Sequence, residues 1–246
     1  MINRASQKSA KDKVRRKYET HERYIIEQEK DWAEALTFGL CTSENNYKVI
    51  IHQVLSEEKQ IMTINEKSDA ACRYWWLAYP RCRPFRGSIF TYENPELMFT
   101  YEKSWSIPFL CWWRPTIKVY DDEESFIGKV VNKFKCWNMQ MLIFDAQNEL
   151  IYEIIGSAWN IGYCCEPICG SWFPISFEIR DSRKDDKTVL SKVVKHTMGC
   201  TTDWCTNADK YYLDFSSVMS YHERILLTVA VHEADMLWFE SKYPIW

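Results

Sequence analysis

Glycine and proline are scarce in this chain, and their scarcity limits the kinds of protein it can be. With 7 glycines and 8 prolines among 246 residues, the sequence excludes collagen-like and low-complexity proteins. It also lacks any run of 18 uncharged apolar residues, the length that a membrane-spanning helix needs. The beginning has no apolar core of a secretory signal, so we expect an intracellular protein whose 10 cysteines are free, buried thiols.

Motifs of common enzyme and metal chemistry are missing as well. The sequence contains no glycine-rich phosphate loop, no G-x-S-x-G and no H-E-x-x-H motif. Cys164, Cys165, Cys169, Cys200 and Cys205 follow C-C-x3-C and C-x4-C spacings instead of the paired C-x2-C knuckles of zinc sites. We therefore predict no catalytic residue, no zinc and no other cofactor, and we expect that the protein is not an enzyme.

Charge is distributed unevenly along the chain. Residues 1–20 hold seven basic and two acidic side chains and carry +5, so the other 226 residues carry −8 of the total charge of −3. A basic segment on an acidic body indicates contact with an anionic membrane surface or an acidic protein partner, and the candidate contacts are Arg15, Arg16 and Lys17. The alternative is a solvated, disordered tail. The acidic body argues against nucleic acid as a partner.

The first unit of the chain, residues 1–36, is predicted to be a partner-binding extension. It begins with a basic tail and continues as an amphipathic helix over residues 20–36, which Thr20 caps. The apolar stripe of this helix, with Ile25 and Trp32, is narrow. We expect the helix to lie on a partner protein or on the surface of the main domain.

The second unit, residues 37–246, is predicted to be mainly β. From Asn46 onward, short runs rich in β-branched and aromatic residues alternate with turn signals such as "ENPE", "DDEES" and "DAQNE". The runs are "YKVII", "IMTI", "IFTY", "LMFTY", "TIKVY", "FIGKVV", "MLIFD", "LIYEII", "PISFEI", "TVLSKVV" and "YYLDF". Many short strands at this spacing are typical of an antiparallel barrel or sandwich.

The last element, residues 223–239, is predicted to be a helix that is apolar on nearly all sides. Seventeen residues reach only about 25 Å at 1.5 Å each, which is less than the ~30 Å hydrocarbon core of a bilayer. Glu233 and Asp235 would also be costly within a bilayer. We therefore predict a central helix inside a barrel, with Thr228, His232 and Asp235 on one face as a polar stripe that barrel side chains or water satisfy.

Four segments of the C-terminal half carry a resemblance to a known family. They are "CCEPICGSWFPISFEIRD" (164–181), "VLSKVVKHTMGC" (189–200), "TNADKYYLDF" (206–215) and "EADMLWFE" (233–240). In the same order they resemble a cysteine-bearing segment before "DFEI", then "VGKISKHWTG", "TDADNFGIQF" and "LIDFMFFE" of the phospholipid scramblases. The resemblance extends over roughly residues 40–243. It implies a closed, tubby-like antiparallel barrel of about twelve strands around a hydrophobic C-terminal helix.

The resemblance also implies a calcium loop, and here its residues are poorly suited to calcium. The loop positions are Asn207, Asp209, Tyr211, Leu213 and Val218. The family has acids at the first, third and twelfth positions, which are Asn207, Asp209 and Val218 here, and Lys210 adds a positive charge. Because calcium needs several oxygen ligands and binds more tightly as their charge increases, we predict that calcium is not bound. The alternative role of Asn207 and Asp209 is to shape a turn before the next strand, in which Asp214 points away from Asp209.

A second departure concerns membrane anchoring. Family members often carry a palmitoylated cysteine cluster, whereas the corresponding "PFLCWWRP" contains only Cys111. Trp112, Trp113 and Arg114 are candidates for insertion into a membrane interface. The alternative is that the tryptophan pair packs on the barrel or on a partner protein.

These observations favour an accessory or scaffold role over calcium-triggered lipid transport. We expect a scramblase-fold subunit of a larger, membrane-associated complex, since tryptophan, tyrosine and arginine are enriched at interfaces. The basic N-terminus makes the mitochondrial inner membrane the expected site. The alternative is an active phospholipid scramblase that moves lipids between membrane leaflets.

Overall fold

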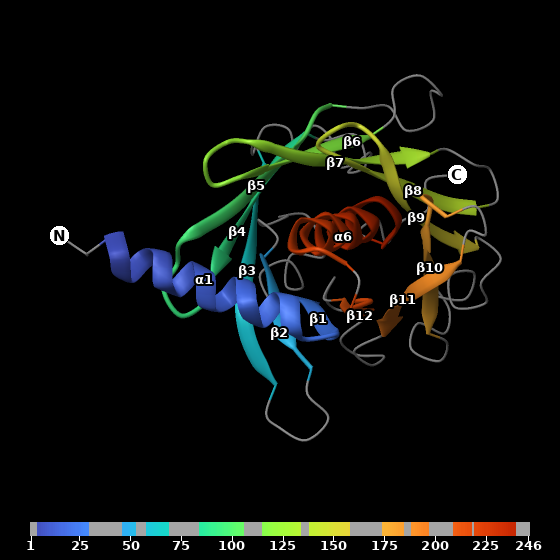
Figure 1. Ribbon diagram of the computed structural model, residues 1–246. Helices are drawn as coiled ribbons and strands as arrows, with labels where there is room; N and C mark the ends of the chain where they lie inside the picture. Colours follow the sequence, from blue (N-terminus) through green and yellow to red (C-terminus); the bar gives the residue numbers. More distant parts are fainter. Residues whose placement is uncertain are drawn as a thin grey trace, which may run out of the picture.

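The computed structural model forms a closed barrel of antiparallel strands around one helix (Figure 1). It describes residues 4–29, 46–52, 58–68, 84–105, 115–133, 138–157, 174–184, 188–196, 209–217 and 219–239. Among these residues, twelve strands follow one another around the barrel in sequence order, and the first strand closes the ring by pairing with the last. The predicted closed barrel with a C-terminal helix and an N-terminal helical extension is confirmed.

The strands coincide with the apolar runs of the sequence. Their bounds are β1 (Arg23–Gln28), β2 (Asn46–Ile51), β3 (Lys59–Lys67), β4 (Phe85–Thr91), β5 (Leu97–Lys103), β6 (Thr116–Asp121), β7 (Phe126–Lys133), β8 (Asn138–Asp145), β9 (Leu150–Ser157), β10 (Ile175–Asp181), β11 (Val189–His196) and β12 (Lys210–Asp214). Buried and exposed side chains alternate along most of them, as in β4 and β10. This alternation is the period of two that a barrel with a filled interior requires.

The N-terminal part of the chain differs from the prediction in two ways. The predicted helix over residues 20–36 is wrong at Arg23–Gln28, which form β1 between β12 and β2. Without β1, strands β12 and β2 would each have an unpaired edge. Pairing with both strands stabilises the extended conformation of Arg23–Gln28 more than its helical sequence pattern favours a helix. The rest of the predicted helix, from residue 30 on, lies outside the described residues.

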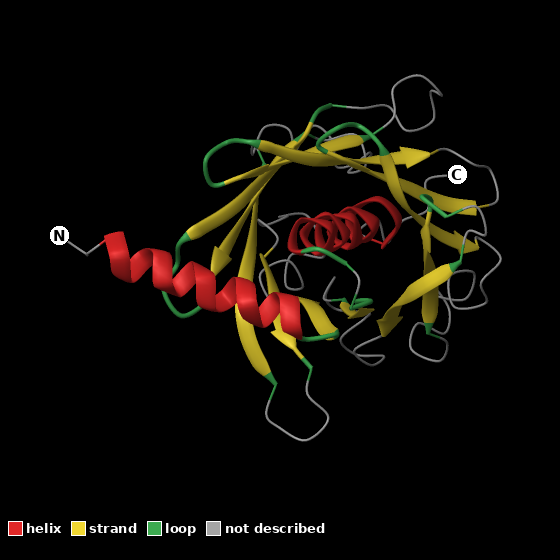
Figure 2. Cartoon of the chain, in the orientation of Figure 1, coloured by secondary structure: helices red, strands yellow, loops and turns green. Residues whose placement is uncertain are grey.

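The predicted basic tail is itself a helix, α1 (Arg4–Thr20). Thr20 therefore ends a helix instead of beginning one, and its hydroxyl donates to the carbonyl of Arg16 at 3.0 Å. Figure 2 shows α1 outside the ring of strands, close to the end where the central helix begins. Tyr18 anchors α1, since its side chain is fully buried in the core.

The central helix α6 (Tyr221–Ala234) continues into a turn of π-helix, η2 (Asp235–Phe239). It begins at a capping box, in which the Ser220 side chain and the Glu223 side chain each bond the other residue's backbone N–H. From Arg224 to Ala234 every side chain is buried. Gly128 of β7 allows close approach here, because a Cβ at this position would lie 2.8 Å from the Leu226 side chain. None of the helices in the described part of the chain has the length and apolarity to span a bilayer.

Short hairpin turns with a shared design lie at the end of the barrel where α6 begins. In three of them the last residue of the strand is an aspartate whose side chain accepts backbone N–H groups of the turn, namely Asp121, Asp145 and Asp181. Thr91 fills this role in the turn between β4 and β5. These turns bring acidic side chains to the same end of the barrel as the basic helix α1.

Candidate functional site

The polar stripe of α6 faces tyrosines that come from separate parts of the chain. The Asp235 carboxyl accepts hydrogen bonds from Tyr47 and Tyr211, each at 2.6 Å and each on a different oxygen. Tyr47 lies on β2 and Tyr211 on β12, the two strands on either side of β1. The carboxyl is therefore fixed at the point where the helix widens into its π turn.

The other two members of the stripe have tyrosine partners too. Thr228 shares a hydrogen bond with the Tyr18 hydroxyl and donates to the Arg224 carbonyl at 3.0 Å. The Nδ1 atom of His232 lies 3.4 Å from the Tyr101 hydroxyl, and the Tyr47 ring packs edge-on against the imidazole with centroids 4.6 Å apart. Tyrosines of the barrel strands and Tyr18 of α1 thus line the predicted stripe.

Burial changes the protonation of Asp235. Its pKa is raised well above the ordinary range, first by burial and then by the neighbouring carboxylate of Asp209. The ammonium of Lys195 and the hydrogen bond from Tyr211 act in the opposite direction. The pKa of Tyr211 is raised as well, by burial and by the acidic neighbours. Asp235 therefore holds a proton over a wider pH range than an exposed aspartate does.

Asp209, the acid retained from the family's calcium loop, has a lysine as its partner. The Nζ atom of Lys195 on β11 lies 3.0 Å from Oδ2 of Asp209, and the lysine side chain is 2% exposed. The same ammonium lies 3.8 Å from the centroid of the Phe239 ring. The Asp209 carboxylate, which would attract a cation from solution, therefore already has the Lys195 ammonium beside it.

Among the loop positions that the structure describes, none besides Asp209 adds a carboxylate to this cluster. Tyr211 and Leu213 face the barrel interior and are each 1% exposed. Asp214 faces outward and pairs with Arg23 at 3.2 Å. Lys210 also faces outward, toward Glu27 at 3.7 Å.

The positive charge expected beside Asp209 was that of Lys210, whereas Lys195 is the lysine that pairs with Asp209 in the structure. Asn207 and Val218 lie outside the described residues.

A second ion pair lies fully inside the barrel. Lys103 of β5 and Glu233 of α6 are 3.7 Å apart, and their side chains are 0% and 2% exposed. The Lys103 ammonium also lies over the Phe85 ring at 5.4 Å. Buried pairs of this kind add little net stability but fix which side of a helix faces which strand. The pair sets the rotation of α6 within the barrel.

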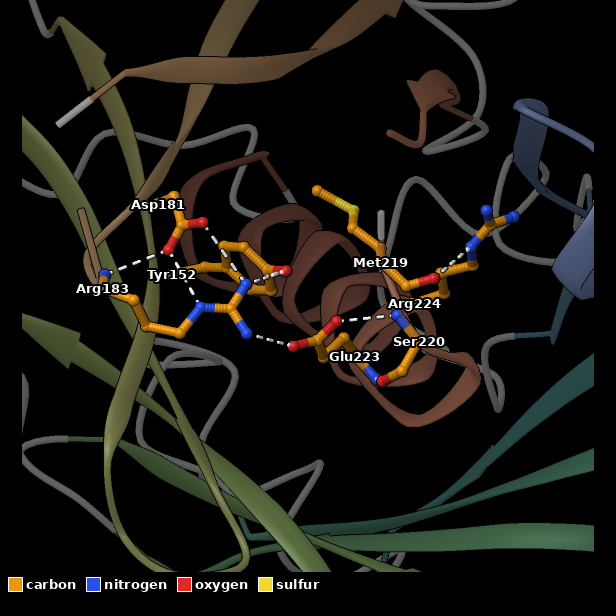
Figure 3. A network of polar contacts seen from close by, with 7 residues as sticks. All are labelled: Tyr152, Asp181, Arg183, Met219, Ser220, Glu223 and Arg224. Carbon is orange, nitrogen blue, oxygen red and sulfur yellow. Dashed lines mark hydrogen bonds and ion pairs between the residues drawn. The ribbon is translucent and has the colours of Figure 1, made fainter. Parts of the chain in front are cut away.

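At its other end, α6 is bound to the turn between β10 and β11 (Figure 3). Arg183 donates to Asp181 at 3.0 Å, to Glu223 at 2.7 Å and to the hydroxyl of Tyr152 at 2.7 Å. Glu223 in turn accepts from the backbone N–H of Ser220 at 2.7 Å. The hydrogen bond to Asp181 raises the pKa of Arg183, and the charges of Tyr152 and Glu223 act in the same direction. Burial acts to raise the pKa of Asp181, but the bonds from Arg183 outweigh it, and the pKa of Asp181 is lowered.

Arg224 joins α6 to α1. The guanidinium is buried and donates to the backbone carbonyls of Tyr18 at 2.7 Å and His21 at 2.6 Å, with further bonds to Ser216 and Met219. Its Nε–Met219 bond is drawn in Figure 3. Among the described residues no carboxylate pairs with Arg224, so backbone carbonyls at the C-terminal end of α1 stabilise the charge.

The residues predicted to contact a membrane or partner are only partly described. Arg15 lies over the Tyr221 ring at 5.2 Å and pairs with Glu19, while Arg16 is exposed. Lys17 is half-buried beside β3. Trp112, Trp113 and Arg114 lie outside the described residues. Part of the basic charge of α1 thus faces the acidic turns of the barrel, as in the pair between Lys11 and Asp122.

The two buried lysines, Lys103 and Lys195, were not predicted from the sequence. In "VLSKVVKH" the alternation places Ser191, Val193 and Lys195 on the inner face, and in "LMFTYEK" it places Lys103 inward beside Tyr101. A lysine on the inner face of a strand is a signal that could have been found. The partners of these lysines come from other elements, so sequence spacing does not reveal them.

The comparisons with known proteins agree with this architecture. The family model described as Scramblase matches residues 7–241, nearly the whole chain. No solved structure matches the chain. The match extends from α1 through the barrel to the central helix, and the motifs that resembled the family in the sequence lie within it. The chain therefore belongs to the scramblase family.

Proposed function

We propose that this scramblase-family barrel works without calcium, as a non-enzymatic accessory subunit of a larger membrane-associated complex. Membership of the family suggests association with membranes. The observation that carries the proposal is the pair between Lys195 and Asp209 at 3.0 Å. The lysine supplies within the chain the positive charge that the loop carboxylate would otherwise take from solution.

The physical case against calcium rests on ligand number and charge. Calcium takes six to eight oxygen ligands at about 2.3–2.6 Å, and carboxylates dominate its tighter sites. Asp209 is one such ligand, and its neighbour Asp235 is engaged by two tyrosine hydroxyls and has a raised pKa. A divalent ion at Asp209 would also be repelled by the Lys195 ammonium, which is confined on a strand.

The case for an accessory role rests on how α6 is held. Its side chains from Arg224 to Ala234 are buried, and its polar groups bond to barrel tyrosines, lysines and α1. A barrel filled in this way favours a rigid scaffold over a conduit for lipids. The exposed Arg16 on α1 and the basic character of this segment favour contact with an acidic partner or membrane. The mitochondrial inner membrane is the compartment we propose, for the basic N-terminus.

The first test is the native state of the endogenous protein. Membranes are solubilised in mild detergent, separated on a native gel, and comigrating proteins are identified by mass spectrometry. We expect the protein to migrate in a large complex of fixed stoichiometry from the mitochondrial inner membrane. Migration alone near 29.4 kDa, with bound phospholipid, would contradict the accessory role.

The family match over residues 7–241 favours a second candidate, an active lipid scramblase. Purified protein reconstituted into vesicles with a fluorescent lipid distinguishes the two functions. The accessory role predicts the same slow lipid exchange between leaflets as in empty vesicles, with and without calcium. Fast exchange in both conditions would favour a calcium-independent scramblase, and exchange that requires calcium would contradict both the accessory role and the assignment of Lys195.

A further inference from the structure

A small cavity lies between α1 and the barrel, away from the interior of the barrel. Its volume is about 200 Å³, and its polar lining comprises Lys13, Lys17, Gln60, Thr91, Glu93 and Asn94. Val14 and Ile61 contribute an apolar floor. The volume is several times the ~30 Å³ that one water molecule occupies in the liquid, yet below the range of drug-sized ligand pockets.

Positive charge exceeds negative charge around this cavity. The Glu93 carboxylate is shared by two lysines, with Lys59 at 3.2 Å on one oxygen and Lys13 at 3.5 Å on the other. Among the described residues no carboxylate pairs with Lys17, whose side chain is half-buried. The lining itself holds two lysines and one carboxylate. Lys59 is not part of the lining but pairs with Glu93, and with it these four groups have an excess of two positive charges.

The protonation equilibria reflect this excess. Burial lowers the pKa of Lys17, and repulsion from Lys59 lowers it further, while Glu93 acts only partly against both. The lysines lower the pKa of Glu93, which therefore stays ionised and is already engaged. An anion placed between Lys17 and Lys59 would relieve their repulsion.

We propose that this cavity binds a phosphate monoester, with the Lys17 ammonium in contact with the phosphate and Lys13 and Lys59 beside it. A phosphate monoester carries about −1.5 to −2 charges at neutral pH and several strong acceptor oxygens, which matches the excess of two positive charges. Lysine is well suited to it as a point charge. Gln60 and Asn94 are also among the lining residues, and their side-chain type can supply amide donors.

Two sources can supply this group, the headgroup of a phosphomonoester lipid and a soluble phosphate compound. The cavity accommodates a headgroup but not acyl chains, so a lipid would bind with its chains outside it. The proposal concerns a site distant from Asp209 and does not depend on the accessory role or on calcium independence.

The test compares two probes on the full-length protein. Inorganic phosphate is titrated while thermal stability is monitored, and vesicles with phosphatidic acid are compared with phosphatidylglycerol vesicles by flotation. The key variant is Lys17→Gln, and the matched control is Lys192→Gln, which removes the same charge from an exposed position on β11. A third variant, Glu93→Gln, removes the carboxylate that competes with the anion.

We expect Lys17→Gln to weaken binding about tenfold, which corresponds to about 1.4 kcal/mol, and Glu93→Gln to tighten it severalfold. Lys192→Gln should change binding less than about twofold, because screened surface charges contribute little. Saturable binding of inorganic phosphate would support the site with a soluble ligand, and preference for phosphatidic acid vesicles would support it with a lipid headgroup. Equal losses in the two lysine variants, or no binding of either probe, would overturn the proposal.

Discussion

The two ends of helix α6 are anchored by different chemistry. At the N-terminal end, Arg183 donates to the carboxylates of Asp181 and Glu223, and Arg224 donates to backbone carbonyls. At the C-terminal end, a carboxyl of raised pKa accepts from two tyrosines, next to a carboxylate that pairs with Lys195. Guanidinium groups keep their charge at any physiological pH, whereas burial raises the pKa of the Asp235 carboxyl well above its ordinary value. The first end therefore holds the fold together, and sensitivity to pH and cations belongs to the second.

The largest expected effect comes from the buried arginine at the N-terminal end. Arg224→Met removes a buried guanidinium that donates to four backbone carbonyls. The carbonyls of Tyr18 and Ser216 keep bonds from the Tyr24 hydroxyl and the Met219 N–H, so the carbonyls of His21 and Met219 are the most affected. We expect a loss of about 3–5 kcal/mol in the free energy of unfolding, from the cost of unsatisfied buried groups. Urea unfolding measures the loss, and hydrogen exchange should show α1 released first.

Arg183→Met is the matched control at the same end. Its side chain is 44% exposed, so its ion pairs are screened by solvent and we expect a loss of about 1 kcal/mol or less. Equal losses in the two variants would contradict the structural role assigned to the buried guanidinium.

The next effect concerns the lysine at the C-terminal end. Lys195→Met leaves Asp209 beside Asp235 without the ammonium that lowers the pKa of Asp235. We expect a loss of about 2–3 kcal/mol at neutral pH, which becomes smaller as the pH falls and the carboxyl groups take up protons. Urea unfolding at several pH values measures both features.

Lys192 lies on the outer face of the same strand, so the variant Lys192→Met serves as the control. It should change the free energy of unfolding by less than about 0.5 kcal/mol. A pH-independent loss in Lys195→Met would show that the lysine acts by packing alone.

A smaller effect is expected at the helix start. Ser220→Ala removes the side chain that accepts the Glu223 N–H in the capping box. We expect a loss of about 1 kcal/mol, independent of pH between 6 and 8, where the cap does not titrate. Thermal or urea unfolding tests this, with Ser217→Ala, an exposed turn residue, as the control.

The smallest effect at neutral pH is expected for Asp235→Asn, which instead changes the pH dependence. The raised pKa means that the folded protein keeps a proton that the unfolded chain releases above about pH 3.8. The contribution of Asp235 to the free energy of unfolding is therefore complete below that pH. It falls as the pH rises toward the pKa of Asp235 in the folded protein. An amide bonds the tyrosines without this proton, so the variant should show a flatter profile. Unfolding free energies between pH 4 and 8 measure it, and a slope equal to the wild type would contradict the assignment.

Much of the fold could be predicted from the sequence because buried and exposed side chains alternate along most of its strands. Eleven runs matched strands, and the helix over residues 223–239 was placed inside the barrel by its apolar circumference and its short length. β1 was missed because "RYIIEQ" lies between acidic residues in a helical pattern, and only its pairing with β2 and β12 reveals it. Such pairing is tertiary and has no local signature.

Of the candidate site, only the residues on the central helix could be predicted from the sequence. The period of the helix brings Thr228, His232 and Asp235 onto one face, which sequence spacing predicts. Their partners Tyr18 and Tyr47 lie far away in sequence, and the tertiary packing that joins them to Thr228 and Asp235 is not encoded in any short motif. The alternation within a strand predicts whether a residue faces the barrel interior, but it does not predict which side chain of the central helix that residue contacts.

In the proposed function, the Lys195 ammonium takes the place of calcium at the carboxylate of Asp209. The most direct measurement is the thermal unfolding midpoint of the wild-type protein during titration with calcium to millimolar concentrations, with magnesium as the control. The structure predicts that calcium does not stabilise the protein more than magnesium does, because the carboxylate of Asp209 already holds an ammonium. Saturable stabilisation by calcium that Asp209→Asn abolishes would contradict the claim.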